Sequence, residues 1–339
     1  MSKACNVAIV GVTGMIGDVL INVLDDHEFP IEKLYLVDEE AVAGGRLMYK
    51  GQSLRVDPLE RFDFSSVRVA IFLCAESVAA TWVQRALAAG CSVIDASGHS
   101  RGDDSLPLAV AGVNPKVLEG RTWPGVVACP DSQVVQAALA LHAVAGSGLE
   151  AVSIATYQSM STRDLDAVEG LALQTGRLLN GQPPEAGALE KQAAFNLIPR
   201  TGDVDEQGYT QNEVRLAEDL RRVLDCPAIP VSVTCILVPV FYGNAAVIHA
   251  KTVESVDVKR LAALVRKAPG VKLLDKPAPG GYPTPVSEAT GSDAVWIGRL
   301  RQDLTDPAGL NMWIVSDNLR KGVVLNSLQT LELLIKDYL

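Results

Sequence analysis

The sequence predicts an α/β protein of two domains, a doubly wound parallel sheet followed by an α+β domain. Short apolar runs alternate with amphipathic segments over the first 130 residues, as in a parallel sheet covered by helices. Longer strand-like runs dominate the rest, which is typical of a mixed or antiparallel sheet. At 339 residues the chain is long enough for two cores of ordinary size.

The first domain is assigned to residues 1–130. Its strands are expected at 7–11, 33–38, 68–74, 92–97, 108–114 and 125–129. Helices are expected after the first glycine turn, at 81–90, and from residue 132. Apolar residues spaced from 319 to 335 predict a C-terminal helix that returns to this domain over 318–339.

The second domain is assigned to residues 131–317. Its strands are expected at 152–161, 231–243, 245–255, 296–303 and 310–318. The second and third of these runs flank Gly243–Asn244, which predicts two long strands around a turn. Residues 180–212 are rich in glycine, proline and polar residues and are expected to be loops.

Composition excludes several classes of partner. Forty acidic against thirty basic residues give a net charge of −10, which disfavours nucleic acid and anionic membranes. No run approaches the roughly 18 apolar residues of a membrane span, and a strand so near the start leaves no room for a signal peptide. The six cysteines lack C-x-x-C spacing and the four histidines are scattered, so we expect reduced thiols, no metal site and a cytoplasmic location.

A glycine turn predicts a dinucleotide site of the Rossmann type. The run GVTGMIG lies between a strand and a helix, where glycine lets the backbone turn tightly beneath a pyrophosphate. Asp38 ends the second strand, at the position of a ribose-binding carboxylate, and favours NAD over NADP because a 2′-phosphate would meet a like charge. The residues expected at the cofactor are Gly11, Thr13, Gly14, Ile16, Gly17 and Asp38.

A second turn has the form of a nucleophile site. In GVVACPDSQVVQ (125–136), an apolar strand leads through a short turn into a helix. The positive end of that helix would stabilise a thiolate or an oxyanion. Cys129 and Ser132 are the candidate nucleophiles, and the local pattern alone leaves the choice between them, or neither, open.

The chain resembles the aspartate-semialdehyde dehydrogenase family nearly from end to end. The runs that carry the resemblance are VAIVGVTGMIG, AAFNLIPRTGDVDEQGYT, VTCILVPVFYG, YPTP, VWIGRLRQDL and NLRKGVVLNSLQ. The resemblance implies a two-domain subunit that works as a homodimer or tetramer. It also implies reduction of an acyl phosphate through a cysteine thioester, with hydride from NADPH.

Three residues of that mechanism are replaced here. Aligned on Pro130 and Gln136, the family's catalytic cysteine falls on Ser132. The family's histidine base, after V-P-V-x-x-G, falls on Asn244, and the arginine that pairs the substrate carboxylate falls on Leu237. Because serine ionises far less readily than cysteine and asparagine cannot accept the proton, the resemblance implies a catalytically degenerate homologue.

The cofactor loops also depart from the family. A Gly-Gly pair after the third strand becomes Ala75–Glu76, and an S-G-A-G loop becomes Ser161 to Asp164. Side chains therefore stand where backbone would approach the dinucleotide, so we expect weakened or lost binding. Ala41 and Val42 replace a family Arg and Ser, which again favours NAD over NADP.

Other family positions are retained. Arg101 corresponds to the arginine that grips the acyl phosphate, and Gln158 to the glutamine beside the nucleophile. Arg215 stands for a lysine and Asp219 for a glutamate near the substrate amine. Asn318 opens the cofactor-proximal run that continues through Lys321 and Gly322.

Rescue of catalysis by other residues is disfavoured. Cys129 precedes the family position by three residues and is expected to be a small buried side chain. His99 is a lone loop histidine, and His249 lies an odd number of residues from Asn244, which points it to the opposite face of a regular strand. An Asp131–Ser132 hydrolase lacks a mediating histidine.

Two functions therefore remain open. The favoured one is a degenerate homologue, a homodimer that acts by binding a small molecule or a partner protein. The alternative is an active NAD(P)-dependent oxidoreductase on a different aldehyde or acyl substrate.

Overall fold

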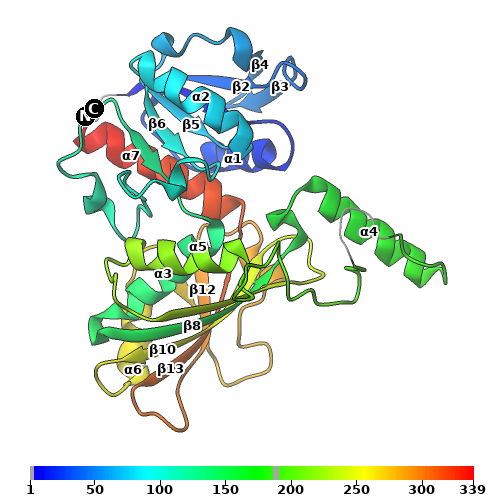
Figure 1. Cartoon of the computed structure of the whole chain (residues 1–339), viewed down its shortest axis with the longest axis vertical. Helices are drawn as coiled ribbons and strands as arrows, with labels where there is room; N and C mark the ends of the chain where they lie inside the picture. The colour runs from blue at the N-terminus through cyan, green and yellow to red at the C-terminus, as the bar shows by residue number, and fades with distance from the viewer. Residues whose placement is uncertain (1–3, 186–190) are drawn as a thin grey trace. The chain divides into compact units, whose positions relative to one another are not determined.

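The computed structural model describes residues 4–185 and 191–339, and the chain forms two compact units (Figure 1). Unit 1 comprises Met1–Asp131 and Val323–Leu339, and unit 2 comprises Ser132–Gly322. The expected loop region 180–212 includes residues 186–190, which lie outside the described residues. Of the helices that are described, none is long and apolar enough to cross a membrane.

Unit 1 is built on a seven-stranded sheet of order β3-β4-β2-β1-β5-β6-β7. Five of its strands were expected and pair in parallel: β1 (Cys5–Val10), β2 (Ile31–Asp38), β5 (Val69–Phe72), β6 (Ser92–Asp95) and β7 (Val126–Ala128). The antiparallel hairpin of β3 (Arg46–Tyr49) and β4 (Gln52–Pro58) was not predicted. The prediction of a strand at 108–114 is wrong. Within this range only Leu108 makes a β-bridge, an isolated one, and the chain then turns.

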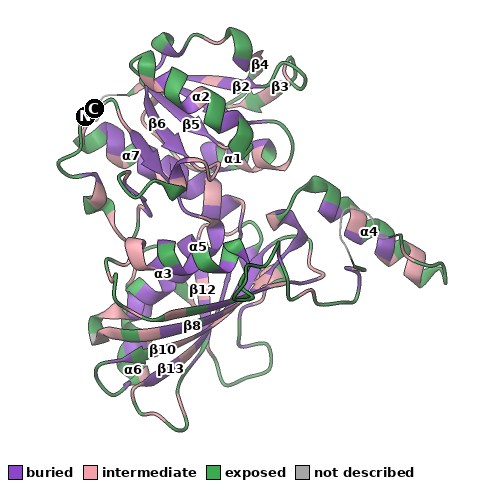
Figure 2. Cartoon of the chain, in the orientation of Figure 1, coloured by how far each residue is buried: buried purple, intermediate pink, exposed green. Residues whose placement is uncertain are grey.

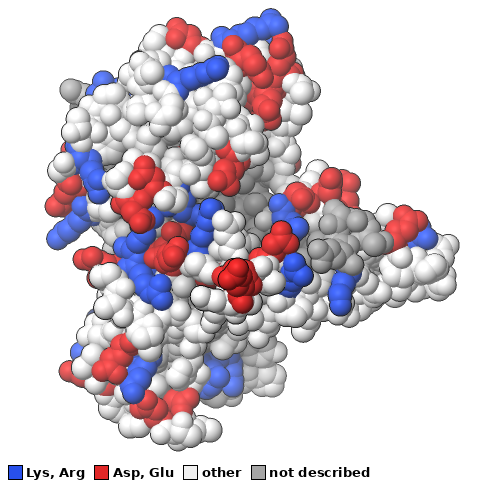
Figure 3. Space-filling view, in the orientation of Figure 1, with Lys and Arg blue, Asp and Glu red and all other residues white. Residues whose placement is uncertain are grey.

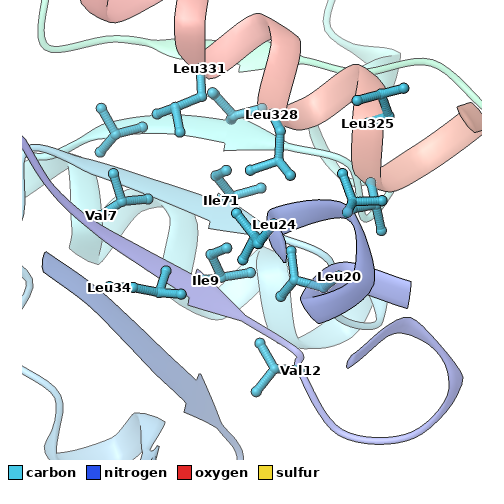
Figure 4. Packing of buried hydrophobic residues seen from close by; sticks show 14 of the residues in the cluster. Val7, Ile9, Val12, Leu20, Leu24, Leu34, Ile71, Leu325, Leu328 and Leu331 are labelled. Atoms are coloured by element: carbon cyan, nitrogen blue, oxygen red, sulfur yellow. The ribbon is translucent and has the colours of Figure 1, made fainter. Parts of the chain in front are cut away.

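Helices cover both faces of this sheet. One face packs against α1 (Met15–Asp26) and α7 (Asn326–Asp337), in a core that includes Ile9, Leu24 and Leu328 (Figure 4). The other face packs against α2 (Glu76–Ala88), through Val83 among others. The C-terminal helix expected from residue 318 begins as α7 only at Asn326, after a π-helical turn at Arg320–Leu325.

Unit 2 is built on a mixed six-stranded sheet of order β11-β12-β13-β10-β8-β9. Its strands are β8 (Leu149–Gln158), β9 (Val231–Leu237), β10 (Asn244–Thr252), β11 (Val271–Leu273), β12 (Val295–Gln302) and β13 (Gly309–Ser316). The turn at Gly243–Asn244 joins β9 to β10, but the two strands are not neighbours. Instead β8 lies between them, parallel to β9 and antiparallel to β10.

Three helices pack on the sheet of unit 2: α3 (Ser132–Val144), α5 (Gln211–Val223) and α6 (Val258–Val265). Every residue of α3 except His142 is buried, whereas α4 (Leu165–Leu179) carries exposed residues along its length (Figure 2). Helix α5 begins with a capping box in which Thr210 and Glu213 satisfy each other's backbone N–H groups. Glu213 Oε1 also accepts from the Cys235 N–H at 2.9 Å, which fixes α5 against β9. The fourth helix, α4 (Leu165–Leu179), projects beyond the sheet (Figure 1).

Candidate functional site

The glycine turn of unit 1 connects β1 to α1, and packing dictates two of its glycines. A Cβ at Gly11 would lie 2.6 Å from the Cys74 Cα, and a Cβ at Gly17 would lie 1.9 Å from the Val12 carbonyl oxygen. Gly14 caps α1 with a φ of 80°, and a Cβ there would meet no atom within 4 Å. Gly14 therefore leaves open space above the turn, where a phosphate can approach the helix N-terminus.

The Asp38 carboxylate is held against the glycine turn. Its Oδ2 accepts from the Thr13 N–H at 2.8 Å, and its Oδ1 accepts from the Glu39 N–H at 2.9 Å. Each oxygen retains a lone pair for a ribose hydroxyl. Thr13 is exposed, while Ile16 packs partly against the core. The turn therefore fits the ribose and phosphate groups of a dinucleotide.

Cys129 is buried in the core of unit 1. Its Sγ lies 3.9 Å from the Ser327 Oγ, within the core of unit 1. Burial raises the pKa of the Cys129 thiol to about 12. The thiolate that a nucleophile needs is therefore absent at neutral pH, in agreement with the expected packing role.

Ser132 is the first residue of α3 and is 7% exposed. A Cβ at Gly322 would lie 2.4 Å from the Ser132 Cβ, so the Gly322 backbone packs directly on Ser132. Gly322 therefore makes room for the residue at the start of α3, and its expected proximity to a cofactor stays a prediction.

Arg101 faces a carboxylate. It follows β6 in a turn where Asp95 accepts from the Ser97 and Ser100 N–H groups at 2.8 Å each. The Arg101 Nη1 lies 4.0 Å from the Asp131 Oδ2, with side chains 14% and 42% exposed. An internal negative charge therefore accompanies the guanidinium that was expected to bind phosphate.

Asn244 is fully buried at the start of β10 and is held as an acceptor. Its Oδ1 accepts from the Ser159 N–H at 2.8 Å, the Ser159 Oγ at 3.0 Å and the Thr162 Oγ1 at 3.0 Å. Asn318 lies beside it, and its Oδ1 accepts from the Ser161 Oγ at 3.2 Å. Because a backbone N–H can only donate, the side-chain oxygen must face Ser159. The cluster is neutral and contains hydroxyls and amides.

Of the two histidines that were considered as alternative bases, His249 belongs to unit 2, as this cluster does, and His99 belongs to unit 1. His249 is on the opposite face of β10, as expected, with its Nε2 3.6 Å from the Asp303 Oδ2. His99 lies half-buried in the turn after β6, and its backbone N–H donates to the Ser97 Oγ at 3.1 Å. Among the described residues no group of three metal-ligating side chains converges.

The remaining expected residues occupy strand ends and α5. Gln158 ends β8, where its Nε2 donates to the Thr156 Oγ1 at 3.2 Å. Asp219 is buried on α5 and lies 3.9 Å from the Arg222 Nη1, whereas Arg215 is half-buried. The Asp219 carboxylate therefore has a cation within its own helix.

Comparison with known proteins identifies the family. Residues 6–121 match the semialdehyde dehydrogenase NAD binding domain, and residues 140–321 match the semialdehyde dehydrogenase dimerisation domain. The chain is 36% identical to aspartate-semialdehyde dehydrogenase 2 of Vibrio cholerae over 339 residues, which is 100% of both chains. The chain belongs to the aspartate-semialdehyde dehydrogenase family.

Relatives in this family carry two kinds of name. A protein of Azotobacter vinelandii named USG-1 protein homolog is 39% identical over 337 residues, covering 99% of each chain, and its name specifies no reaction. Among solved structures, aspartate semialdehyde dehydrogenase II from Vibrio cholerae superposes with a TM-score of 0.95 at 36% identity, covering 99% of this chain and 100% of that one. A probable aspartate-semialdehyde dehydrogenase from Pseudomonas aeruginosa gives 0.94 at 35% identity, with the same coverage. The expected two-domain α/β fold is confirmed.

One feature of this aspartate-semialdehyde dehydrogenase homologue was not predicted. Leu237, buried at the end of β9, lines a cavity of about 630 Å³ together with a loop from residues 196–203. Arg163, Lys191 and Arg200 also line it. These cations are far apart in the sequence, so the sequence did not predict that they cluster. The arginine at 163, where the family resemblance implies a small residue, could have indicated the cluster.

Proposed function

We propose that this member of the aspartate-semialdehyde dehydrogenase family no longer reduces an acyl phosphate and acts by binding. The proposal rests above all on the turn before α3. That turn offers a serine hydroxyl at the helix start, and its thiol, Cys129, is buried with its pKa raised to about 12. Formation of a thioester requires an accessible thiolate, which this arrangement does not supply.

Two further arrangements support the loss of catalysis. Asn244 uses its side-chain oxygen to accept three hydrogen bonds and has no lone pair suited to proton transfer at neutral pH. Asp131 adds a negative charge near Arg101, which opposes the binding of phosphate. Each arrangement involves a residue at a position to which the family resemblance assigns a part in the reaction.

The glycine turn supports retained binding of a dinucleotide, and we propose NAD rather than NADP. A bound nicotinamide would donate or accept hydride. The Asp38 carboxylate, fixed by Thr13 and Glu39, suits ribose hydroxyls and repels a 2′-phosphate. Neither Ala41 nor Val42 can neutralise such a phosphate.

The assembly we propose is a cytoplasmic homodimer. The match of residues 140–321 to a dimerisation domain supports the dimer. Six free cysteines support a reducing compartment. On the face shown in Figure 3, acidic and basic side chains are interspersed. The mass in solution, measured by light scattering, tests the dimer.

The decisive experiment is a turnover assay with aspartate semialdehyde, phosphate and either NAD or NADP. We expect no turnover above the background of heat-denatured protein. A rate of about 1 s⁻¹ or more, within the ordinary range of enzymes, would contradict the proposal. Calorimetric titration with each dinucleotide, on the same preparation, tests binding separately from turnover.

A combined variant tests whether the scaffold can still support the chemistry. Ser132→Cys, Leu237→Arg and Asn244→His together restore the three side chains that the family resemblance implies. Recovered turnover attributes the loss to these positions alone. Failure with dinucleotide binding intact implicates Asp131, which remains in the triple variant.

The alternative is an oxidoreductase with a different carbonyl substrate. The intact glycine turn with its fixed Asp38 favours this reading. It requires dinucleotide binding, so the same titration decides it: absence of binding to both NAD and NADP excludes the alternative, whereas tight NAD binding calls for a screen of aldehydes.

A further inference from the structure

A cavity in unit 2 combines three cationic side chains with an apolar wall. Its volume is about 630 Å³, ample for a small organic molecule. The lining residues are Arg163, Lys191, Asn196, Leu197, Ile198, Pro199, Arg200, Gly202, Asp203 and Leu237. All of these described lining residues belong to unit 2.

The charge around the cavity is positive. The described lining residues include three cations, Arg163, Lys191 and Arg200, and one carboxylate, Asp203, which leaves two net positive charges (3 − 1 = 2). This excess stands out in a chain whose net charge is −10. A local excess of cations in a concave site attracts an anion, and the attraction is stronger there than on a convex surface.

The two arginines are oriented by the loop that forms one wall. The Arg163 Nη1 donates to the Thr201 carbonyl oxygen at 3.4 Å. The Arg200 Nε donates to the Gly202 carbonyl oxygen at 2.8 Å, and its Nη2 lies 3.2 Å from the Asp203 Oδ1. Neither set of contacts uses all five N–H groups of a guanidinium, so both side chains retain donors for a ligand.

The apolar wall is fixed by backbone hydrogen bonds. The Ile198 N–H donates to the Leu237 carbonyl oxygen at 3.0 Å, and the Leu237 N–H donates back at 2.9 Å. This pair attaches the loop to the end of β9. In the same loop, the buried Thr201 Oγ1 has no hydrogen-bond partner among the described residues. Thr201 lies in the sequence between the lining residues Arg200 and Gly202. Its hydroxyl can therefore donate a hydrogen bond to an acceptor atom of a ligand.

We propose that this cavity binds a small organic dianion with a short aliphatic body, such as a dicarboxylate or an alkyl phosphate. Two net positive charges match a dianion, and the leucine, isoleucine and proline side chains suit methylene groups. Guanidinium forks bind carboxylate and phosphate oxygens equally well. The inference rests on the proposed function in one respect: if the protein acts by binding, the cavity assigns its ligand to a chemical class.

The test uses adipate as the probe, titrated into the full-length protein by NMR at low ionic strength. Adipamide is the matched neutral molecule, and butyl phosphate represents the phosphate class. We expect adipate to bind at millimolar concentration and adipamide to bind at least tenfold more weakly. Tighter binding of butyl phosphate than of adipate assigns the site to phosphomonoesters, and the reverse assigns it to dicarboxylates.

Variants locate the binding. Arg163→Gln and Arg200→Gln should each weaken adipate about fivefold to tenfold, consistent with one charge-assisted contact at a partly exposed site. Arg163→Lys keeps the charge and should lose less than Arg163→Gln. Lys267→Gln, which removes an exposed cation away from the cavity, should leave adipate binding unchanged.

Three results would overturn the inference: equal binding of adipate and adipamide, no binding of either anion, or equal effects of Lys267→Gln and Arg163→Gln. Thermal unfolding of each variant shows whether weaker adipate binding reflects misfolding. If Arg163→Gln misfolds, the adipate affinity of Arg163→Lys decides the test. The proposed function fails separately, through turnover of aspartate semialdehyde, so absence of adipate binding in a protein without turnover rejects the cavity alone.

Discussion

The Arg101 Nη1 lies 4.0 Å from the Asp131 Oδ2, in two turns that follow the neighbouring parallel strands β6 and β7. The Asp131 carboxylate thereby offsets the positive charge that Arg101 would otherwise present to an anion at this end of the unit 1 sheet. An anion that approaches Arg101 must compete with a carboxylate that the chain itself supplies.

Removal of that carboxylate should therefore strengthen anion binding. We expect Asp131→Asn to raise the affinity for inorganic phosphate by up to about fivefold, the scale of a partly exposed ion pair. Calorimetric titration at low salt measures the change. Glu119→Gln, which removes an exposed charge elsewhere in unit 1, is the control. Equal affinities in Asp131→Asn and the native chain would contradict the competition.

The start of α3 should still activate a thiol. In Ser132→Cys, the introduced thiol lies at a helix N-terminus, where the backbone dipole favours the thiolate. We expect the pH midpoint of its alkylation, followed by mass spectrometry, to fall below 8.5. Ser105→Cys, on an exposed turn, gives the reference midpoint. A midpoint at or above that reference would show that the helix end no longer activates the residue. Cys129 should stay unlabelled in both variants.

Asn244 should be important for stability. Asn244→Ala leaves the buried Ser159 N–H without the acceptor that now lies 2.8 Å away. We expect a loss of about 1–3 kcal/mol in the free energy of unfolding, the cost of one unsatisfied buried group. Urea unfolding measures it. Asn180→Ala, at the exposed C-cap of α4, should change stability by less than about 0.5 kcal/mol. Unchanged stability of Asn244→Ala would mean that the hydroxyl cluster finds other acceptors.

Lys321 should destabilise the fold in a pH-dependent way. Burial lowers the pKa of its ammonium group from 10.5 to about 8, and Asp293 partly opposes that shift. Between pH 8 and 10.5 the unfolded chain holds more protons at this residue than the folded chain does. The penalty is therefore complete below pH 8 and disappears as pH rises through this window.

Lys321→Met should accordingly stabilise the protein at pH 7, by up to about 3 kcal/mol. The advantage over the native chain should shrink toward pH 10.5. Thermal unfolding of both proteins across this pH range measures the difference in stability. The buried cysteines titrate in both proteins, so their contribution cancels in that difference. Lys336→Met, on the exposed side of α7, should show no such trend. A gap that is constant with pH would refute the assignment.

The local parts of the fold followed from sequence, and the non-local parts did not. Gly11 and Gly17 were correctly placed in a tight turn, because a strand, a turn and a helix are contiguous. The run through 231–255 suggested neighbouring strands around Gly243, yet β8 inserts between them from 70 residues or more earlier in the chain. The β3–β4 hairpin escaped notice because its strands carry few buried residues.

The candidate site shows the same division. The serine at 132 and the asparagine at 244 were visible in the sequence, and their interpretation as replacements of catalytic residues stays a prediction. The expected burial of Cys129 is confirmed. The pairing of Arg101 with Asp131 depends on two strands being adjacent, which topology decides. The three cations of the cavity lie at positions 163, 191 and 200, and the bridge between Ile198 and Leu237 attaches the loop that carries Arg200 to the end of β9.

The division of the chain also affects its synthesis. Unit 2 interrupts unit 1, which resumes only at Val323 and then supplies α7. Leu328 and Leu331 of that helix cover the same sheet face as α1. On the ribosome, a sheet complete through β7 therefore keeps part of its apolar face exposed until all of unit 2 has emerged. This long-lived exposed surface is where we expect chaperones to bind the nascent chain.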